Sequence, residues 1–169
     1  MDVVIDAQIV CGFFRESVLS QNTELTGSTL PIFDRLGNGD IVYLDENSKI
    51  ENEWRGIVDN EWFDAWYPEL LISGKAQLIK VRKNQGVSKQ LLKNNFPTHS
   101  KDAWYVLTAI NVKEMTHRAS LLSEDLDFYA PKEKGCKKDR RLRILLTCSG
   151  KMAKYIKNVV LIYTALPPM

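Results

Sequence analysis

Short apolar runs alternate along the chain with longer stretches of helical periodicity. A short apolar run bounded by polar or turn residues is typical of a strand that is buried on both faces. We predict strands at residues 3–5, 41–44, 121–122, 142–147 and 159–163. Residues 76–81 fit either a strand or the end of the preceding helix, because periodicity does not separate the two.

Between these runs, apolar residues recur at spacings of three and four, which predicts amphipathic helices. We predict helices at about residues 6–19, 30–36, 47–58, 62–72, 88–94, 102–110 and 150–157. The clearest pattern is the stripe of Ala103, Val106, Leu107 and Ile110. Asp102 lies in the first turn of that helix, where the helix dipole favours an anion.

The order of these elements predicts the fold class. Strands separated by helices form right-handed crossover units, which give a mostly parallel sheet flanked by helices. With 169 residues, the chain is long enough for a single domain with a substantial core. We therefore expect one α/β domain over residues 1–169, with ligands at the carboxyl ends of its strands.

Composition adds an asymmetry of charge to this picture. The chain is 44% hydrophobic and 26% charged, which is ordinary for a globular protein. Residues 1–70 hold fourteen acids and four bases, a net charge of −10, whereas residues 71–169 hold seven acids and nineteen bases, a net charge of +12. Such a split favours an acidic region that binds cations beside a basic surface that binds a polyanion. Two solvated faces that pair with each other are the alternative.

Two classes of protein fit the sequence poorly. The apolar runs are too short to span a bilayer, and acids stand near the N-terminus where a signal peptide has bases. We expect a cytoplasmic protein without a membrane segment. Cys11, Cys136 and Cys148 are odd in number and widely spaced, which indicates reduced, small apolar residues instead of a zinc site or disulfides.

Four carboxylates stand where one folded site can collect them. Asp6 ends the first predicted strand and Asp125 follows the strand at 121–122, while Asp102 and Glu53 belong to predicted helices. Carboxylate oxygens are the ligands that Mg²⁺ and Mn²⁺ prefer, and a phosphodiester supplies further oxygens. Taken singly, each acid also fits a plainer role as a helix cap, a surface residue or a turn residue.

Glu53 is the most informative of the four acids. A helical wheel places it at the margin of the apolar stripe that includes Ile50 and Ile57, so its carboxylate faces the protein. A carboxylate in that position is costly without cationic partners, and a metal ion explains it. Glu46 is the alternative ligand if the phase of this helix differs.

These residues resemble the acidic motifs of the PIN-domain nucleases. VIDAQIV at 4–10 is similar to the opening strand and turn of that family, and KDA at 101–103 is similar to its third acidic motif. LSEDLDF at 122–128 resembles the fourth motif and is the most specific match, while Glu53-Trp54 resembles the middle glutamate motif. The resemblance covers about residues 2–163. Gln8 departs from it, because the family often has asparagine there.

The resemblance implies a Rossmann-like, three-layer domain that binds Mg²⁺ or Mn²⁺ and hydrolyses RNA, with DNA as an alternative substrate. The implied catalytic and metal-binding residues are Asp6, Glu53, Asp102 and Asp125. Asp127 is either a fifth ligand or a support for Asp125. Many small relatives are toxins that pair with an antitoxin, and many form dimers, so a homodimer and an antitoxin-like protein are candidate partners.

Further residues are candidates for substrate binding. Ser123 and His99 stand next to the acidic motifs, and the stretch 132–143 holds seven bases in twelve residues. Within that stretch we expect phosphate contacts from Lys137, Lys138, Arg140 and Arg141. A turn serine, a loop histidine and a mobile solvated loop are the respective alternatives.

The tryptophans are at helical spacing and are expected mostly in the core, although Trp62 or Trp66 stacking on a base is an alternative. Two other functions compete with nuclease activity. One is a catalytically inactive PIN-like module that binds nucleic acid, and the other is an interaction protein whose acidic and basic faces bind proteins.

Overall fold

A five-stranded sheet forms the centre of the computed structural model, which describes residues 1–97 and 101–163. Its strand order is β3-β2-β1-β4-β5, and every neighbouring pair is parallel. The strands are β1 (Asp2–Ile5), β2 (Ile41–Asp45), β3 (Ala76–Ile79), β4 (Ser120–Leu122) and β5 (Leu161–Tyr163). The predicted α/β class with a parallel central sheet is confirmed.

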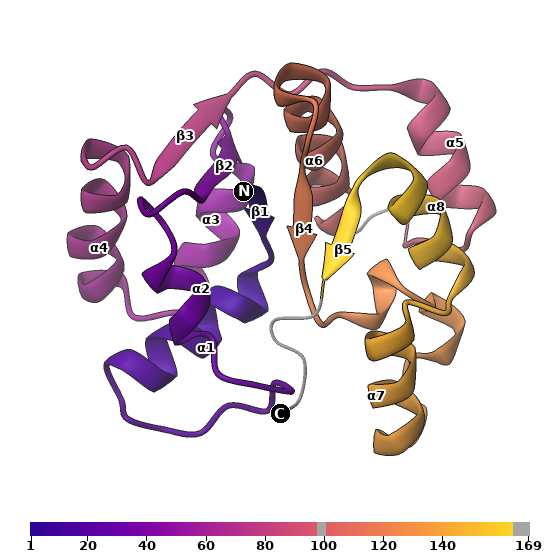
Figure 1. Ribbon diagram of the computed structural model, residues 1–169, viewed down its shortest axis with the longest axis horizontal. Helices are drawn as coiled ribbons and strands as arrows, with labels where there is room; N and C mark the ends of the chain where they lie inside the picture. The colour runs from indigo at the N-terminus through magenta and orange to yellow at the C-terminus, as the bar shows by residue number, and fades with distance from the viewer. Residues whose placement is uncertain (98–100, 164–169) are drawn as a thin grey trace.

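Helices flank this sheet and complete a Rossmann-like, three-layer arrangement. The α-helices are α1 (Ala7–Ser17), α2 (Leu30–Asp34), α3 (Lys49–Arg55), α4 (Asn60–Ile72), α5 (Gln85–Lys93), α6 (Asp102–Thr116), α7 (Lys138–Thr147) and α8 (Lys151–Val159). Two 3-10 turns, η1 (Leu126–Phe128) and η2 (Pro131–Glu133), lie between β4 and α7. Figure 1 shows α1 to α4 gathered on one side of the molecule and α5 to α8 on the other.

The first strand forms the middle of the core. Val3, Val4 and Ile5 are each at most 1% exposed, because helices cover both faces of a central parallel strand. Trp54 on α3 is fully buried, and its indole nitrogen donates a hydrogen bond of 3.1 Å to the carbonyl of Ile5. The carboxyl end of β1 is thereby fixed to the helix that carries Glu53.

The direction of strand addition reverses at β1. The chain adds β2 and β3 on one side of β1, then returns through α6 to add β4 and β5 on the other side. Helix α6 contacts β1, β2 and β4 along this crossover. Such a reversal opens a crevice at the carboxyl ends of the two strands that flank it, here β1 and β4. The amide of Asp6 donates to the carbonyl of Leu122 over 2.9 Å, which joins the two strand ends.

One predicted strand is wrong. Residues 142–147 belong to helix α7, because the apolar run there is one face of a helix that begins at Lys138. Ile144 and Leu145 are buried while Arg143 and Leu146 are exposed, which is a helical spacing and not the alternation of a strand. A continuous apolar run of this length does not by itself distinguish the two.

Several helix boundaries also differ from the prediction. The helix expected to reach Val58 ends at Arg55, and Ile57 is 41% exposed instead of continuing the apolar stripe. Helix α1 ends at Ser17, two residues before the predicted end. The ambiguous segment from residue 76 forms strand β3, paired with β2 at the edge of the sheet.

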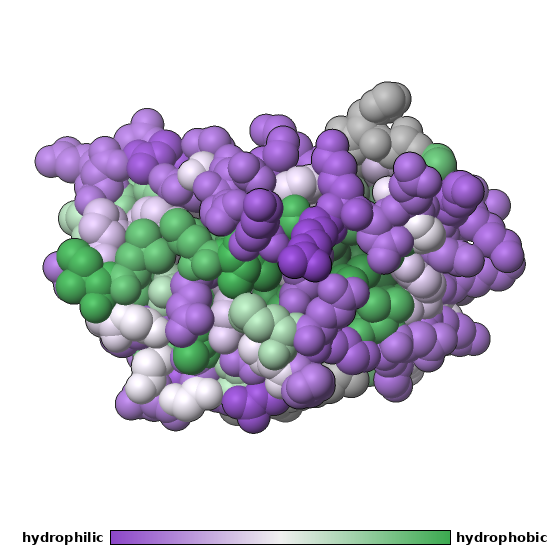
Figure 2. Space-filling view, turned by 90° about the horizontal axis from the view of Figure 1, so that it is seen from above, coloured by the Kyte–Doolittle hydropathy of each residue, from purple (hydrophilic) through white to green (hydrophobic). Residues whose placement is uncertain are grey.

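Polar residues cover most of the face of the molecule that Figure 2 shows. From the side shown in Figure 2, apolar residues form a broken band that polar residues border and interrupt. None of the helices in the described part of the chain is long and apolar enough to cross a membrane. The predicted cytoplasmic location stays a prediction.

Candidate metal centre

Asp6 lies at the bottom of the crevice between β1 and β4. It directly follows β1 in extended conformation, and its side chain makes no capping hydrogen bond to α1. The carboxyl is only 3% exposed and accepts a hydrogen bond of 2.5 Å from the hydroxyl of Ser123. Burial raises the pKa of Asp6 to about 7, and the negative charges of Asp102, Asp125 and Glu53 act in the same direction, against the Ser123 hydrogen bond.

Ser123 connects the two strand ends. Its hydroxyl donates to Asp6 and accepts the amide of Asp125 over 3.0 Å. Its carbonyl accepts the hydroxyl of the buried Tyr129 over 2.7 Å. Since the single hydroxyl proton is used by Asp6, the structure places Ser123 as a positioning residue for the acids. The expected contact with substrate stays a prediction.

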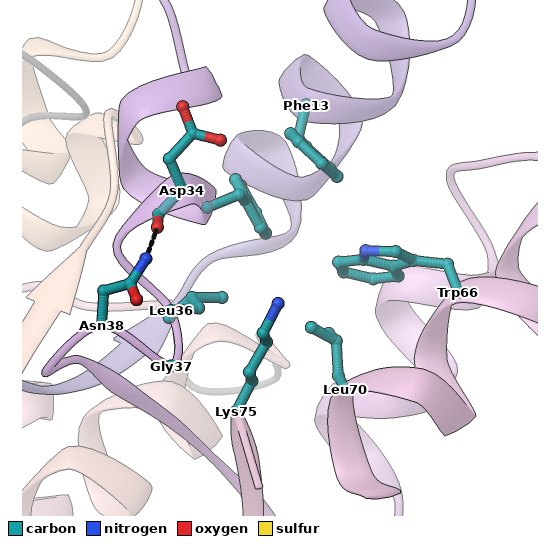
Figure 3. Close-up of a pocket in the computed structure, with 9 residues that line it drawn as sticks. Phe13, Asp34, Leu36, Gly37, Asn38, Trp66, Leu70 and Lys75 are labelled. Atoms are coloured by element: carbon teal, nitrogen blue, oxygen red, sulfur yellow. Dashed lines mark hydrogen bonds between the residues drawn. The ribbon is translucent and has the colours of Figure 1, made fainter. Parts of the chain in front are cut away.

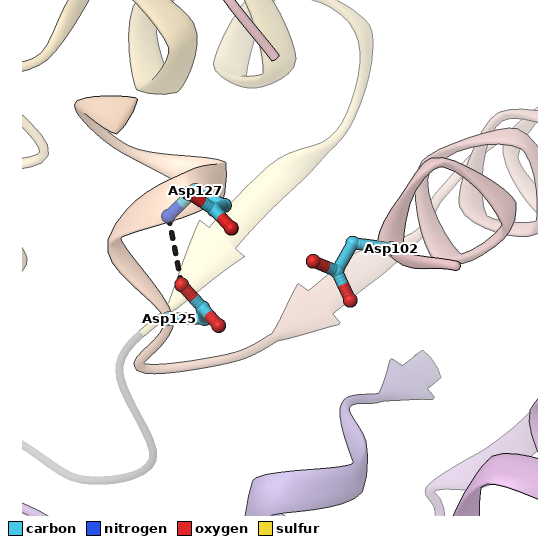
Figure 4. Close-up of side chains that lie close together, drawn as sticks. All are labelled: Asp102, Asp125 and Asp127. Atoms are coloured by element: carbon cyan, nitrogen blue, oxygen red, sulfur yellow. Dashed lines mark hydrogen bonds between the residues drawn. The ribbon is translucent and has the colours of Figure 1, made fainter. Parts of the chain in front are cut away.

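Three aspartates form the tightest acidic group in the described part of the chain. Asp102, Asp125 and Asp127 each offer a carboxylate oxygen, and these oxygens lie within 4.8 Å of one another. Figure 4 shows Asp102 reaching from the start of α6 toward Asp125 and Asp127 at the η1 turn. Three hard oxygen ligands at this separation are suited to one divalent cation.

The η1 turn itself is built by one of these acids. The Asp125 carboxylate accepts the amide of Asp127 over 2.9 Å and so caps the turn. Its other oxygen lies 3.5 Å from the amide nitrogen of the Gln8 side chain. Asp125 therefore does stabilise a turn, which was the alternative role for this residue. This role is compatible with metal binding, because each carboxylate has several lone pairs.

Glu53 lies on α3, half-buried and near enough to Asp102 and Asp125 to be affected by their charges. Its pKa is raised, first by burial and then by the negative charge of Asp102, while the hydroxyl of Tyr105 and the charge of Lys101 lower it. The charge of Asp125 also raises this pKa. Glu53 thus faces the acidic crevice, as its helical phase indicated, whereas Glu46 is exposed.

The structure brings all of the predicted acids to one edge of the sheet. Electrostatic coupling links Asp6 with Glu53, Asp102 and Asp125, and the closest group adds Asp127 to Asp102 and Asp125. From the sequence, Asp127 was either a metal ligand or a residue that supports Asp125. Its buried carboxylate belongs to the compact triad. Assignment of catalytic roles to these residues stays a prediction.

Two charged residues at the centre were missed. Lys134 forms an ion pair of 2.6 Å with Asp127 and lies 3.9 Å from Asp125, so it offsets part of the negative charge. The sequence signal for Lys134 was its position within the basic stretch at residues 132–143. Glu124 is fully buried and accepts the amide of Thr26 over 3.0 Å, with Arg141 at 3.9 Å. Glu124 binds a loop that is about a hundred residues away in the sequence, so no pattern among its neighbouring residues predicts this role.

The basic stretch is ordered by ion pairs of its own. Arg140 forms a two-pronged pair with Glu133, at 2.5 and 2.7 Å, and Arg141 donates to the carbonyl of Glu124 over 2.8 Å. Lys137 and Lys138 are exposed at the start of α7. Lys138, Arg140 and Arg141 thus lie on a helix, and Lys137 directly precedes it. Their expected phosphate contacts stay a prediction. His99, a candidate substrate contact, lies outside the described residues.

One of the two paired tryptophans, Trp66, lines a different cavity. Trp62 and Trp66 stack with ring centroids 4.7 Å apart, and Trp66 borders a cavity of about 350 Å³ together with Phe33 and Lys75. Figure 3 shows Lys75 and Trp66 pointing into it. Since Lys75 directly precedes β3, this cavity lies toward the amino ends of the strands, whereas the acids are at the carboxyl ends. Base stacking by Trp66 at the candidate metal centre is therefore not favoured, and base stacking by Trp62 stays a prediction.

The three cysteines are free thiols, in agreement with the absence of a disulfide pattern.

Comparison of the chain with known protein families, with curated proteins and with solved structures finds no match.

Proposed function

We propose that the protein is a metal-dependent nuclease that hydrolyses phosphodiester bonds, with RNA as the favoured substrate. One observation carries the proposal: oxygens of Asp102, Asp125 and Asp127 lie within 4.8 Å of one another at the switch point of a parallel α/β sheet. Ligands of α/β proteins bind at such a point. The resemblance of the acidic motifs to those of PIN-domain nucleases supports the same conclusion.

The donor set fits a hard divalent cation. All three ligand groups are carboxylates, and two further acids, Asp6 and Glu53, increase the negative charge around them. Both of these acids have raised pKa values, first because they are buried and further because the neighbouring carboxylates are negative, so their charged forms lack compensation. A bound cation would provide that compensation. Mg²⁺ and Mn²⁺ are therefore the proposed cofactors.

The chain's own residues would divide the work as follows. Asp102, Asp125 and Asp127 would hold the cation, and Ser123 fixes Asp6 beside them through its 2.5 Å hydrogen bond. Lys134 partly neutralises Asp127 and limits the repulsion among the acids. When bound, the cation would supply an activated water and offset the charge that develops on the phosphodiester oxygens.

The test is cleavage of a mixed panel of single-stranded RNA and DNA oligonucleotides by the purified protein with Mg²⁺ or Mn²⁺. We expect cleavage, its loss with a chelator, and a decrease of at least about a hundredfold in Asp125→Asn, since even residues that only support a metal ligand change activity by 10- to 100-fold. Asp139→Asn, an exposed aspartate on α7, is the matched control and should retain activity.

Absence of metal-dependent cleavage in the folded wild-type protein would contradict this proposal. Binding of the oligonucleotides without cleavage would instead identify a catalytically inactive binding module. The homodimer and the antitoxin-like partner stay predictions of the resemblance.

A further inference from the structure

A groove of about 830 Å³ begins beside the metal centre. Helix α1 forms its floor, the loop at residues 18–29 forms one wall, and the start of α7 forms another. Gln8 stands at the junction, because it lines the groove and its side-chain nitrogen lies 3.5 Å from a carboxylate oxygen of Asp125. A ligand in the groove would therefore extend directly from the acidic crevice.

The lining of the groove combines three cations and one carboxylate, that of Glu24, with apolar surface, so its net charge is positive. Arg15 and Lys138 are exposed, and neither forms an ion pair within the described parts of the chain. Arg141 adds a third, partly used guanidinium. Leu25 and Ile57 supply apolar surface, and Ile57, two residues beyond the end of α3, is 41% exposed. Such a lining suits a ligand with an anionic backbone and flat apolar groups.

The loop wall is held firmly in place. The Glu124 carboxylate accepts the amide of Thr26, and the Glu16 carboxylate accepts the amide of Thr29 over 2.8 Å. The loop also packs closely on α1 at Gly12, where an added Cβ would lie 2.7 Å from Leu25 and 2.9 Å from Thr29. The groove is therefore preformed, as small-ligand sites usually are.

We infer that this groove binds a nucleotide that adjoins the scissile phosphodiester of a single-stranded polynucleotide. Arg15 and Lys138 contact its phosphates, and its base lies against Leu25 and Ile57. A single strand is required, because only an unpaired base presents its flat face to side chains. The inference rests on the proposed nuclease function and assigns the substrate path to particular residues.

Binding of a labelled single-stranded 12-mer in a chelating buffer tests the groove without cleavage, with RNA and DNA of the same sequence as separate arms. We expect Arg15→Ala and Lys138→Ala each to weaken binding by about tenfold, because each removes a charged contact. Each should also flatten the log-log dependence of affinity on salt by about 0.7. Ile57→Ser should weaken binding and leave the salt slope unchanged. Lys154→Ala, an exposed lysine on α8 outside the groove, is the matched control.

Cys11 provides a second readout, since its thiol lines the groove. In a Cys136→Ser, Cys148→Ser background, the 12-mer should slow alkylation of Cys11. If the wild type cleaves the substrate but the groove variants keep its affinity and salt slope and the 12-mer does not slow alkylation of Cys11, the groove is not the binding site and the nuclease proposal stands. If binding depends on the groove but no cleavage occurs, only the nuclease activity is contradicted. If neither groove-dependent binding nor cleavage occurs, the groove assignment and the nuclease proposal are both contradicted.

Discussion

At the scale of single residues, Asp6 shows how the fold makes an acid unstable in its charged form. Its carboxyl is almost completely buried, has one hydrogen-bond donor in Ser123, and faces the charges of Asp102, Asp125 and Glu53. The pKa is about 7 in the folded protein against 3.8 for an ordinary aspartate. Folding is therefore linked to the protonation of this group.

This linkage predicts a pH dependence of stability in the metal-free protein. Between about pH 4 and pH 7 the folded state keeps a proton on Asp6 that the unfolded state has lost, so the contribution of Asp6 to the free energy of unfolding falls as pH rises, by up to about 4 kcal/mol. Asp6→Asn should abolish this contribution and raise the melting temperature at pH 8. Thermal melts from pH 4 to pH 8 with a chelator measure both effects.

The control for this experiment is Asp139→Asn, which should keep the profile of the wild type because Asp139 is exposed. A lower melting temperature for Asp6→Asn at pH 8 would show that the charged form of Asp6 is stabilised in the fold, contrary to this interpretation.

At the scale of elements, α7 determines where the basic residues point. A helix beginning at Lys138 places Arg141, Ile144 and Leu145 on one inner face, where Arg141 meets Glu124. A strand over residues 142–147 would instead have turned Ile144 and Leu146 to the same side. The helix also leaves Lys138 on the wall of the groove.

Two alanine variants distinguish a helix from a strand in this segment. Leu145 is 1% exposed, so Leu145→Ala should lower the free energy of unfolding by about 2–5 kcal/mol. Leu146 is 45% exposed, and Leu146→Ala should change it by no more than about 0.5 kcal/mol. Urea denaturation measures both. The reverse order of the two effects would contradict the helix.

At the scale of the whole molecule, the candidate metal centre joins segments that are far apart along the chain. Asp6 follows β1, Glu53 comes from α3, Asp102 from α6, and Asp125 and Asp127 from the η1 turn. A cation that binds only this assembled site must stabilise the folded state as a unit, by about 2.7 kcal/mol at a concentration a hundred times its dissociation constant.

We therefore expect the melting temperature of the wild type to keep rising with the concentration of Mg²⁺ or Mn²⁺ above the dissociation constant, and that of Asp102→Asn to change little. Differential scanning calorimetry with and without the ion measures this difference. Glu114→Gln, on the exposed surface of the same helix, should respond like the wild type. An equal response of Asp102→Asn would remove Asp102 from the centre.

Local pattern was sufficient for much of this architecture. Alternation of apolar runs with helical periodicity predicted the parallel α/β class and four of the five strands. A central strand is buried on both faces and therefore consists of consecutive apolar residues, such as Val3, Val4 and Ile5. Asp6 and Asp125 were found because they follow strands, Asp102 because it begins a helix, and Glu53 because it lies at the margin of an apolar stripe. Their positions relative to those elements are local properties.

Only the tertiary structure decided what depends on contacts between distant segments. Packing decided that residues 142–147 form a helix, because the apolar pattern from Leu142 to Thr147 fits a helix and a strand equally well. The inclusion of Asp127 in the triad, the ion pair with Lys134 and the Thr26–Glu124 anchor all depend on how segments meet after folding. The sequence determined which acids stand at the ends of strands; the strand order, which places β1 beside β4, determined that they share one crevice.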